Sequence, residues 1–203
     1  MVNMKDKILN AALKQFLAHG KKGATTKAIA ESAGANKAMI HYYYTSKDKL
    51  FTACVKEILE QMEQTFHTVE VRSIDDYKTY IESLIKSYTI FITTHNKNII
   101  FLLWEYLNDE TLLNDIKNIM GSAHLVDFIE KTKKAIDKGV IKNIEPLSLY
   151  LNLFSLILST YTVLPIALSF LDEESEENKK IIMEKRQKEI SRLLWDDIKG
   201  VNE

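Results

Sequence analysis

The sequence predicts an all-α protein, and three observations carry this prediction. The 203 residues contain only two prolines and six glycines, so few positions would interrupt a long helix. Apolar residues recur with a period near 3.6 along most of the chain. Short polar breaks divide these periodic runs into about nine or ten helices. A chain of this length suits one or two domains and can bury a substantial core.

The first helix is predicted at residues 5–19, and Gly20 is its expected end. Its apolar residues fall on one face, which should cover two shorter helices that follow. Phe16 is expected to fill the small core between the three helices, with Ile29, Ile40 and Tyr44 around it.

Residues 25–49, TTKAIAESAGANKAMIHYYYTSKDK, have the pattern of a helix-turn-helix. Thr25 or Thr26 can cap a short helix, which Gly34 ends in a left-handed conformation. After a tight turn, Asn36 precedes a second helix at residues 37–44. Two short helices joined by a glycine-containing turn place one helix in the major groove of DNA.

Side chains in this segment are assigned to two kinds of DNA contact. Phosphate contacts fix the position of a protein on DNA, whereas contacts to base edges read its sequence. The residues expected at phosphates are Thr26, Lys27, Lys37, Tyr42 and Lys47. The residues expected at base edges or sugars are Asn36, Met39, His41 and Tyr43. Either Tyr42 or Tyr43 could instead pack sideways on the domain.

Charge is distributed unevenly along the chain. The first 50 residues hold nine lysines and three acidic residues, a net charge of +6, and the remainder holds 18 basic and 25 acidic residues, a net charge of −7. This asymmetry indicates a basic nucleic-acid-binding module joined to an acidic body. A chance excess of solvated lysines is the alternative.

Enzymatic and metal-binding functions are not expected. Cys54 is the single cysteine, which excludes an intrachain disulfide and a cysteine-rich zinc site. The five histidines fall in no metal-ligand spacing, and no phosphate-binding glycine loop or nucleophile motif occurs. The sequence therefore predicts no cofactor. The N-terminus lacks the apolar core of a signal peptide, so a cytoplasmic location is expected.

A long helix should begin in a capping box formed by Thr45 and Asp48 and continue to about Val69. Further helices are predicted at residues 75–95, 99–107, 112–120 and 123–138. Aromatic and polar side chains on these middle helices could line a cavity for a small-molecule effector. The candidates are Tyr88, Phe91, Phe101, Trp104, Glu105, His124, Phe128 and Phe154. Packing in the core is the alternative for each aromatic residue.

No charged residue occurs between Leu147 and Leu171, a run long enough to raise the question of a membrane span. Serine, threonine and asparagine residues spread through the run argue against that interpretation. A helix buried on nearly all sides at a dimer interface is the preferred explanation. Pro165 is expected to kink or end it. A homodimer would form through this helix, at residues 146–171, and a last helix at residues 179–199.

Residues 5–50 resemble the TetR-like one-component transcriptional repressors. The resemblance rests on ILNAALKQFLAHG, T-x-x-IA-x-x-AG, NKAMIHYYY and SKDKLF, which follow one another without a gap. It implies a three-helix DNA-binding domain at residues 1–46 and an effector-binding and dimerisation domain at residues 47–203. It also implies a repressor that binds a palindromic operator as a dimer and is released by an effector. Because Ala38 and His41 depart from the usual family residues, an interaction module that has lost DNA binding is the alternative.

Overall fold

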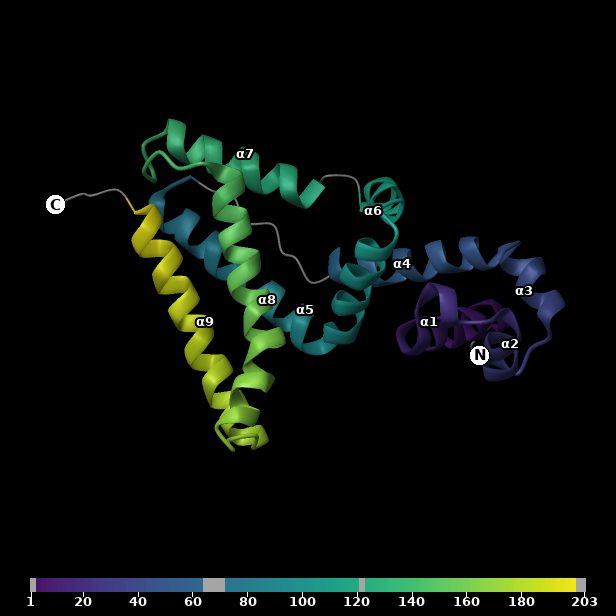
Figure 1. The fold of residues 1–203 in the computed structure, drawn as a ribbon. Coiled ribbons are helices and arrows are strands. Elements are labelled where there is room, and N and C mark those ends of the chain that lie inside the picture. The colour runs from purple at the N-terminus through teal and green to yellow at the C-terminus, as the bar shows by residue number, and fades with distance from the viewer. Residues whose placement is uncertain (1–2, 64–71, 121–122, 200–203) are drawn as a thin grey trace. The chain divides into compact units, whose positions relative to one another are not determined.

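The structure is a computed structural model that describes residues 3–63, 72–120 and 123–199. In these ranges the chain forms nine α-helices and no strand, which confirms the predicted all-α class (Figure 1). The helices are α1 (Met4–Gly23), α2 (Thr26–Ala33), α3 (Lys37–Tyr44), α4 (Lys47–Glu63), α5 (Ile74–Asn108), α6 (Leu112–Met120), α7 (Ala123–Asp137), α8 (Pro146–Phe170) and α9 (Glu176–Ile198).

The chain divides into two compact units. The first comprises residues 1–63 and 97–121, and the second comprises residues 64–96 and 122–203. The division crosses α5 beside His95, whose φ of −127° and ψ of 30° interrupt the helical conformation. Two separate helices were expected here, at residues 75–95 and 99–107. The structure has one kinked helix, α5, over both ranges. The polar stretch around His95 contains no glycine or proline that would end the helix there.

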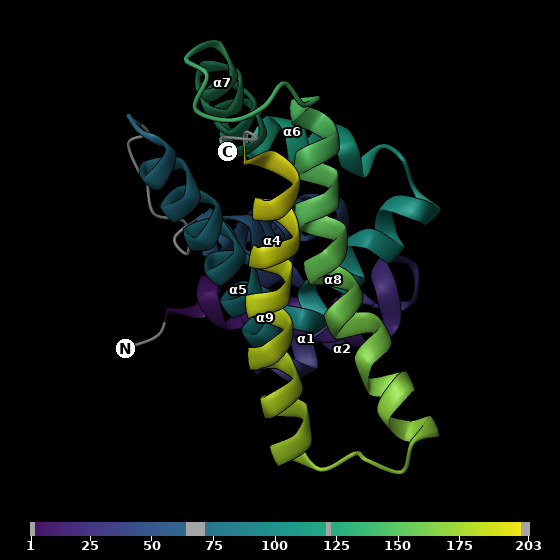
Figure 2. The same cartoon turned by 90° about the vertical axis from the view of Figure 1, so that its left-hand side faces the viewer.

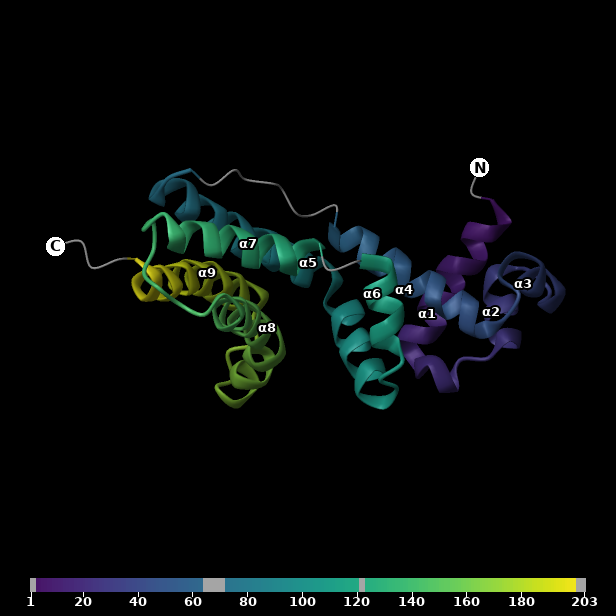
Figure 3. The same cartoon turned by 90° about the horizontal axis from the view of Figure 1, so that it is seen from above.

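In the first unit, α1 packs on α2 and α4, and these helices and α3 lie together in Figure 3. Phe16, Ile29 and Ile40 are fully buried, as predicted. The ring of Phe16 also meets that of Phe51 edge to face, with centroids 5.2 Å apart. The three N-terminal helices therefore share a core with α4, which makes α4 an integral part of the N-terminal helical domain.

The connection between α3 and α4 differs from the predicted capping box. Thr45 has a φ of +66° and ends α3, because its backbone N–H donates to the carbonyl of His41 at 2.9 Å. Ser46 caps α4 instead, with Oγ accepting from the N–H of Lys49 at 3.1 Å. The prediction of Thr45 as the cap was wrong, since a connection this short needs Thr45 to close the preceding helix. The predicted end of this helix, residues 64–69, lies outside the described residues.

In the second unit, α8 packs along α7 and α9, and α8 and α9 run side by side (Figure 2). Leu149, Leu153 and Ile157 of α8 are buried at this contact. Pro165 does not end α8, which continues to Phe170. The last helix begins earlier than predicted, because Ser175 caps it and accepts from the N–H of Asn178 at 3.2 Å.

Candidate nucleic-acid interface

Side-chain caps fix the ends of both helices in the helix-turn-helix. Thr25 Oγ1 accepts from the N–H of Ala28 at 3.1 Å, so Thr25 and not Thr26 is the cap of α2. Gly34 ends α2 with a φ of +63°, a conformation that suits glycine. Asn36 Oδ1 accepts from the N–H of Met39 at 3.0 Å and caps α3. These caps set the turn that presents α3.

One face of α3 is buried and the opposite face is open to solvent. Ile40 and Tyr44 are buried, whereas Tyr42 is 82% exposed. The exposed residues of α3 and its cap include Asn36, Lys37, Met39, His41, Tyr42 and Tyr43. The rings of Tyr42 and Tyr43 meet edge to face with centroids 4.9 Å apart. Six of the nine predicted DNA-binding residues are thus exposed on α3 and its cap.

The side chains of His41 and Asn36 also form hydrogen bonds with backbone groups. His41 Nδ1 lies 2.8 Å from the carbonyl oxygen of Thr45, which orients the imidazole at the end of α3. Because a carbonyl oxygen only accepts, Nδ1 carries the hydrogen. The carbonyl oxygen of the Asn36 amide accepts the hydrogen bond of the cap, whereas its amino group is a donor that the cap does not use.

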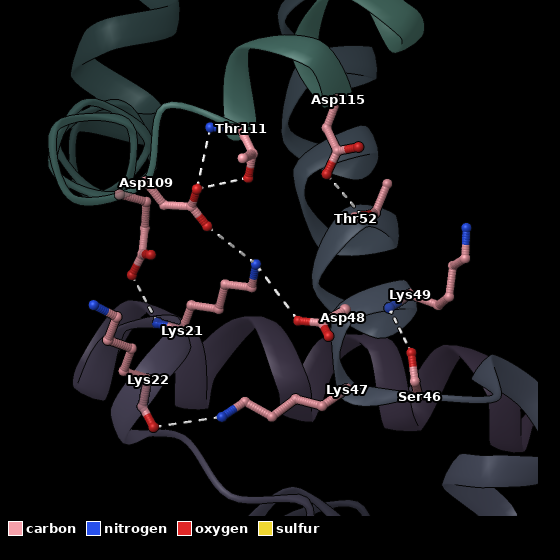
Figure 4. Close-up of polar contacts among 11 residues, drawn as sticks. Lys21, Lys22, Ser46, Lys47, Asp48, Lys49, Thr52, Asp109, Thr111 and Asp115 are labelled. Carbon is pink, nitrogen blue, oxygen red and sulfur yellow. Dashed lines mark hydrogen bonds and ion pairs between the residues drawn. The ribbon is translucent and has the colours of Figure 1, made fainter.

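The predicted phosphate-binding lysines differ in their surroundings. Lys27 and Lys37 are exposed. Lys47 lies at the start of α4, where its Nζ donates to the carbonyl of Lys22 at 3.4 Å and connects α4 to the end of α1 (Figure 4). If Lys47 also bound a phosphate, its ammonium group would donate both to the phosphate and to the carbonyl oxygen of Lys22.

A polar junction between α1, α4 and the end of α5 was not predicted from the sequence. Lys21 Nζ lies 3.5 Å from Asp48 of α4 and 3.6 Å from Asp109, which follows α5 (Figure 4). The backbone N–H of Lys21 donates to Glu105 Oε1 at 2.7 Å. The adjacent Gly20 has a φ of +69°. In the sequence, only the break after residue 19 signalled this site.

A second polar contact connects α4 to α6. Thr52 Oγ1 donates to Asp115 Oδ2 at 3.0 Å, and both side chains are drawn in Figure 4. Together with the Lys21 junction, this contact fixes the start of α4 to the end of α5 and to α6. Because α4 shares the core of the helix-turn-helix, these contacts also set the position of α3.

The eight predicted effector-binding residues are divided between the two units. Phe101, Trp104 and Glu105 belong to the first unit, and the other five belong to the second. Glu105 is only 4% exposed, and its carboxylate accepts from the backbone of Lys21. Trp104 lies at Gly20, where an added Cβ would come within 2.9 Å of the indole.

In the second unit, several of the predicted aromatic residues meet around Tyr150. The ring of Tyr150 lies 5.3 Å from Phe128 and 6.5 Å from Phe154, and Tyr88 lies 5.8 Å from Phe154. The hydroxyls of Tyr88 and Tyr150 are 3.0 Å apart and hydrogen bonded. Burial raises the pKa of Tyr88 well above its usual value, so the phenol of Tyr88 stays neutral. Phe91 instead packs on His95, at 5.0 Å between ring centroids.

No group of three or more histidine, cysteine or acidic side chains is placed to hold a metal ion in the part of the chain that the structure describes. The chemistry of the exposed α3 surface is instead that of hydrogen bonding and charge. Lysine ammonium groups suit phosphate, and amide, imidazole and phenol groups suit base edges.

Comparison with known proteins identifies the family. The profile described as "Bacterial regulatory proteins, tetR family" matches residues 8–54. The probable HTH-type transcriptional regulator YttP of Bacillus subtilis is 30% identical over 168 residues, which cover 81% of this chain and 77% of YttP. The HTH-type transcriptional repressor AcnR of Corynebacterium efficiens is 34% identical over 64 residues, 32% of this chain and 34% of AcnR.

The fold is similarly shared with solved structures. The crystal structure of the transcriptional regulator SCO4942 from Streptomyces coelicolor superposes with a TM-score of 0.72 at 15% identity, covering 97% of this chain and 98% of that one. Both curated relatives are named as HTH-type transcriptional regulators or repressors. With the helix-turn-helix formed and its second helix exposed, the chain belongs to the TetR family of bacterial regulatory proteins and is a DNA-binding transcriptional regulator.

Proposed function

We propose that the protein is a cytoplasmic repressor that binds a palindromic operator as a homodimer and is released by a small-molecule effector. The observation that carries the DNA-binding part is the exposure of α3 and its cap, which present polar, basic and aromatic side chains to solvent: Asn36, Lys37, Met39, His41, Tyr42 and Tyr43. Repression is supported by the resemblance of the N-terminal region to AcnR, which is named as a repressor. Binding near a promoter would then block transcription.

Dimerisation is supported by an apolar face on α8. Leu151, Val163, Ile166 and Phe170 are between 55% and 85% exposed, although they are large apolar side chains. By length and composition α8 could also cross a membrane. We favour a dimer because α8 packs along two amphipathic helices, α7 and α9, whose outer faces are charged. A twofold axis through α8 and α9 would present two copies of α3 to half-sites about 34–36 Å apart.

Effector binding is supported by the aromatic cluster around Tyr150. Its two hydrogen-bonded phenols, on α5 and α8, offer polar atoms among aromatic rings, which is the usual composition of a small-molecule site. An effector inserted there would have to separate the Tyr88 and Tyr150 hydroxyls or bond to them. It would release DNA only if it bound the DNA-free state more tightly.

The experiment that tests this function is selection of bound fragments from fragmented genomic DNA, followed by gel-shift titration. We expect a palindromic site, bound by two chains at low salt. Lys37→Gln should weaken binding to all sequences, and Phe170→Glu should yield monomers that bind a full site poorly. A protein that is not retained on any DNA at low salt would instead be an interaction module of the same fold. Retention of monomers with full affinity would contradict the proposed dimer.

A further inference from the structure

The second unit contains a groove between the first half of α5 and α9, and none of the aromatic cluster residues lines it. Its volume is about 500 Å³, which lies in the range of small-molecule sites. Residues from only these two helices line it: Lys78, Glu82, Ile85 and Lys86 of α5, and Gln187, Lys188, Ser191, Arg192 and Trp195 of α9.

The groove is strongly basic, although the second unit as a whole contains many acidic residues. Four of the lining side chains are basic and only Glu82 is acidic. Arg192 is already paired with Glu189 at 2.6 Å and with Asp196 at 3.3 Å. Among the residues that the structure describes, no ion pair engages Lys86 or Lys188. Two ammonium groups, one from each wall, thus remain to bind an anion.

Beside this charge, the groove offers apolar surface. The indole of Trp195 is partly exposed, and Lys78 Nζ lies 5.7 Å from its ring centroid. Ile85 is almost completely buried and lies at the base of the groove. A flat apolar group could therefore pack against Trp195 while an attached acid group meets the lysines.

The hollow continues into a recess between α5, α8 and α9. A second recess of about 400 Å³ begins at Gln187, which lines both, and its walls carry the hydroxyls of Thr89, Thr93 and Tyr161. Its basic and acidic side chains balance, with two lysines and two glutamates. The groove therefore has one basic end and one neutral end, which fits a molecule with a single acidic group.

We propose that the groove between α5 and α9 binds a small amphiphilic anion, a carboxylate, sulfonate or phosphate attached to an aromatic or other apolar body. The acid group lies between Lys86 and Lys188, and the apolar body packs on Trp195 and extends toward Gln187. This site is separate from the α3 surface and does not depend on DNA binding.

The probe for this site is 1-anilinonaphthalene-8-sulfonate, titrated into the full-length protein and followed by its emission and by quenching of Trp195. Because the chain has two tryptophans, the titration is carried out in a Trp104→Phe background. Lys86→Gln/Lys188→Gln should weaken binding about tenfold, the effect of removing two partly exposed ion pairs. The matched control, Lys134→Gln/Lys138→Gln on and just after α7, removes the same charge outside the groove and should change binding less than about twofold.

A neutral analogue with the same aromatic body, N-phenyl-1-naphthylamine, tests the role of charge. We expect it to bind about tenfold more weakly than the sulfonate, with an affinity that salt does not reduce. Equal affinity for the two probes would overturn the proposal. Equal losses in the two double variants, or probe binding without quenching of Trp195, would overturn it as well. Gel shifts with the same variants distinguish failure of the anion-binding proposal from failure of the proposed DNA binding. If the groove binds no anion, the protein should still bind DNA.

Discussion

Replacing Gly20 with alanine should destabilise the first unit more than replacing any other glycine with a positive φ. Gly20 has a φ of +69° and a ψ of 170°, a region that is almost restricted to glycine and costs about 1–3 kcal/mol for other residues. An alanine Cβ would also lie 2.9 Å from Trp104 Cζ3 and 3.0 Å from Glu105 Oε1. Both neighbours would have to move.

Movement of Glu105 would disrupt its 2.7 Å hydrogen bond from the N–H of Lys21. A hydrogen bond to a charged group contributes about 1.5–3 kcal/mol. Adding this loss to the backbone strain, we expect Gly20→Ala to lower the free energy of unfolding by about 4 kcal/mol. In a protein of this size, that loss corresponds to a decrease in Tm of about 10 °C.

The matched control is Gly34→Ala in the same unit. Gly34 has a φ of +63°, but an added Cβ would meet no atom within 4 Å. We therefore expect a loss of only about 1 kcal/mol. Thermal unfolding followed by circular dichroism, at one fixed protein concentration, compares the two variants. Equal losses would refute the close approach of Gly20 to α5. Adding Trp104→Ala to Gly20→Ala should recover part of the loss, since it removes one of the two contacts.

Three further predictions concern the DNA-binding end. Lys37→Gln should reduce the slope of log K against log salt by about one in gel-shift titrations, because it removes one phosphate contact; an unchanged slope would place Lys37 away from the backbone. Asn36→Ala should lower the free energy of unfolding by about 1 kcal/mol through loss of the α3 cap, and Asn36→Asp, which keeps the cap, should restore stability in urea titrations but weaken DNA binding. Burial raises the pKa of Cys54 to about 12, so the thiol should resist alkylation at pH 8 in the folded protein and react in urea. Since unfolding lowers that pKa, stability should fall as the pH rises above about 9; rapid alkylation of the folded protein would show that Cys54 is accessible.

The local features of the helix-turn-helix could be predicted because each depends on neighbouring residues. Caps such as Asn36 act on an N–H three positions away, and Gly34 needs only its own backbone conformation. The apolar period of α1 likewise placed Phe16 in the core. At these positions, the residue types and their spacing are sufficient to predict the local structure.

Other features depend on residues far apart in the sequence and could not be predicted. Lys21 and Glu105 are 84 positions apart, so no local pattern marks their hydrogen bond. For the same reason, Glu105 was assigned to an effector site, which stays a prediction. The choice between Thr45 and Ser46 as a cap depended on how α3 ends, and both residue types suit the position. The boundary predicted between residues 46 and 47 also stays a prediction.

The hydrogen bond between His41 and the carbonyl of Thr45 affects which bases the imidazole could read. When the ring carries a single hydrogen, that hydrogen is on Nδ1, and the opposite nitrogen, Nε2, has a lone pair and can only accept. At a base edge in the major groove, such an acceptor matches the amino group of adenine or cytosine and is mismatched with O6 or N7 of guanine. Through this hydrogen bond, the carbonyl oxygen of Thr45 restricts the bases that the side chain of His41 could bind.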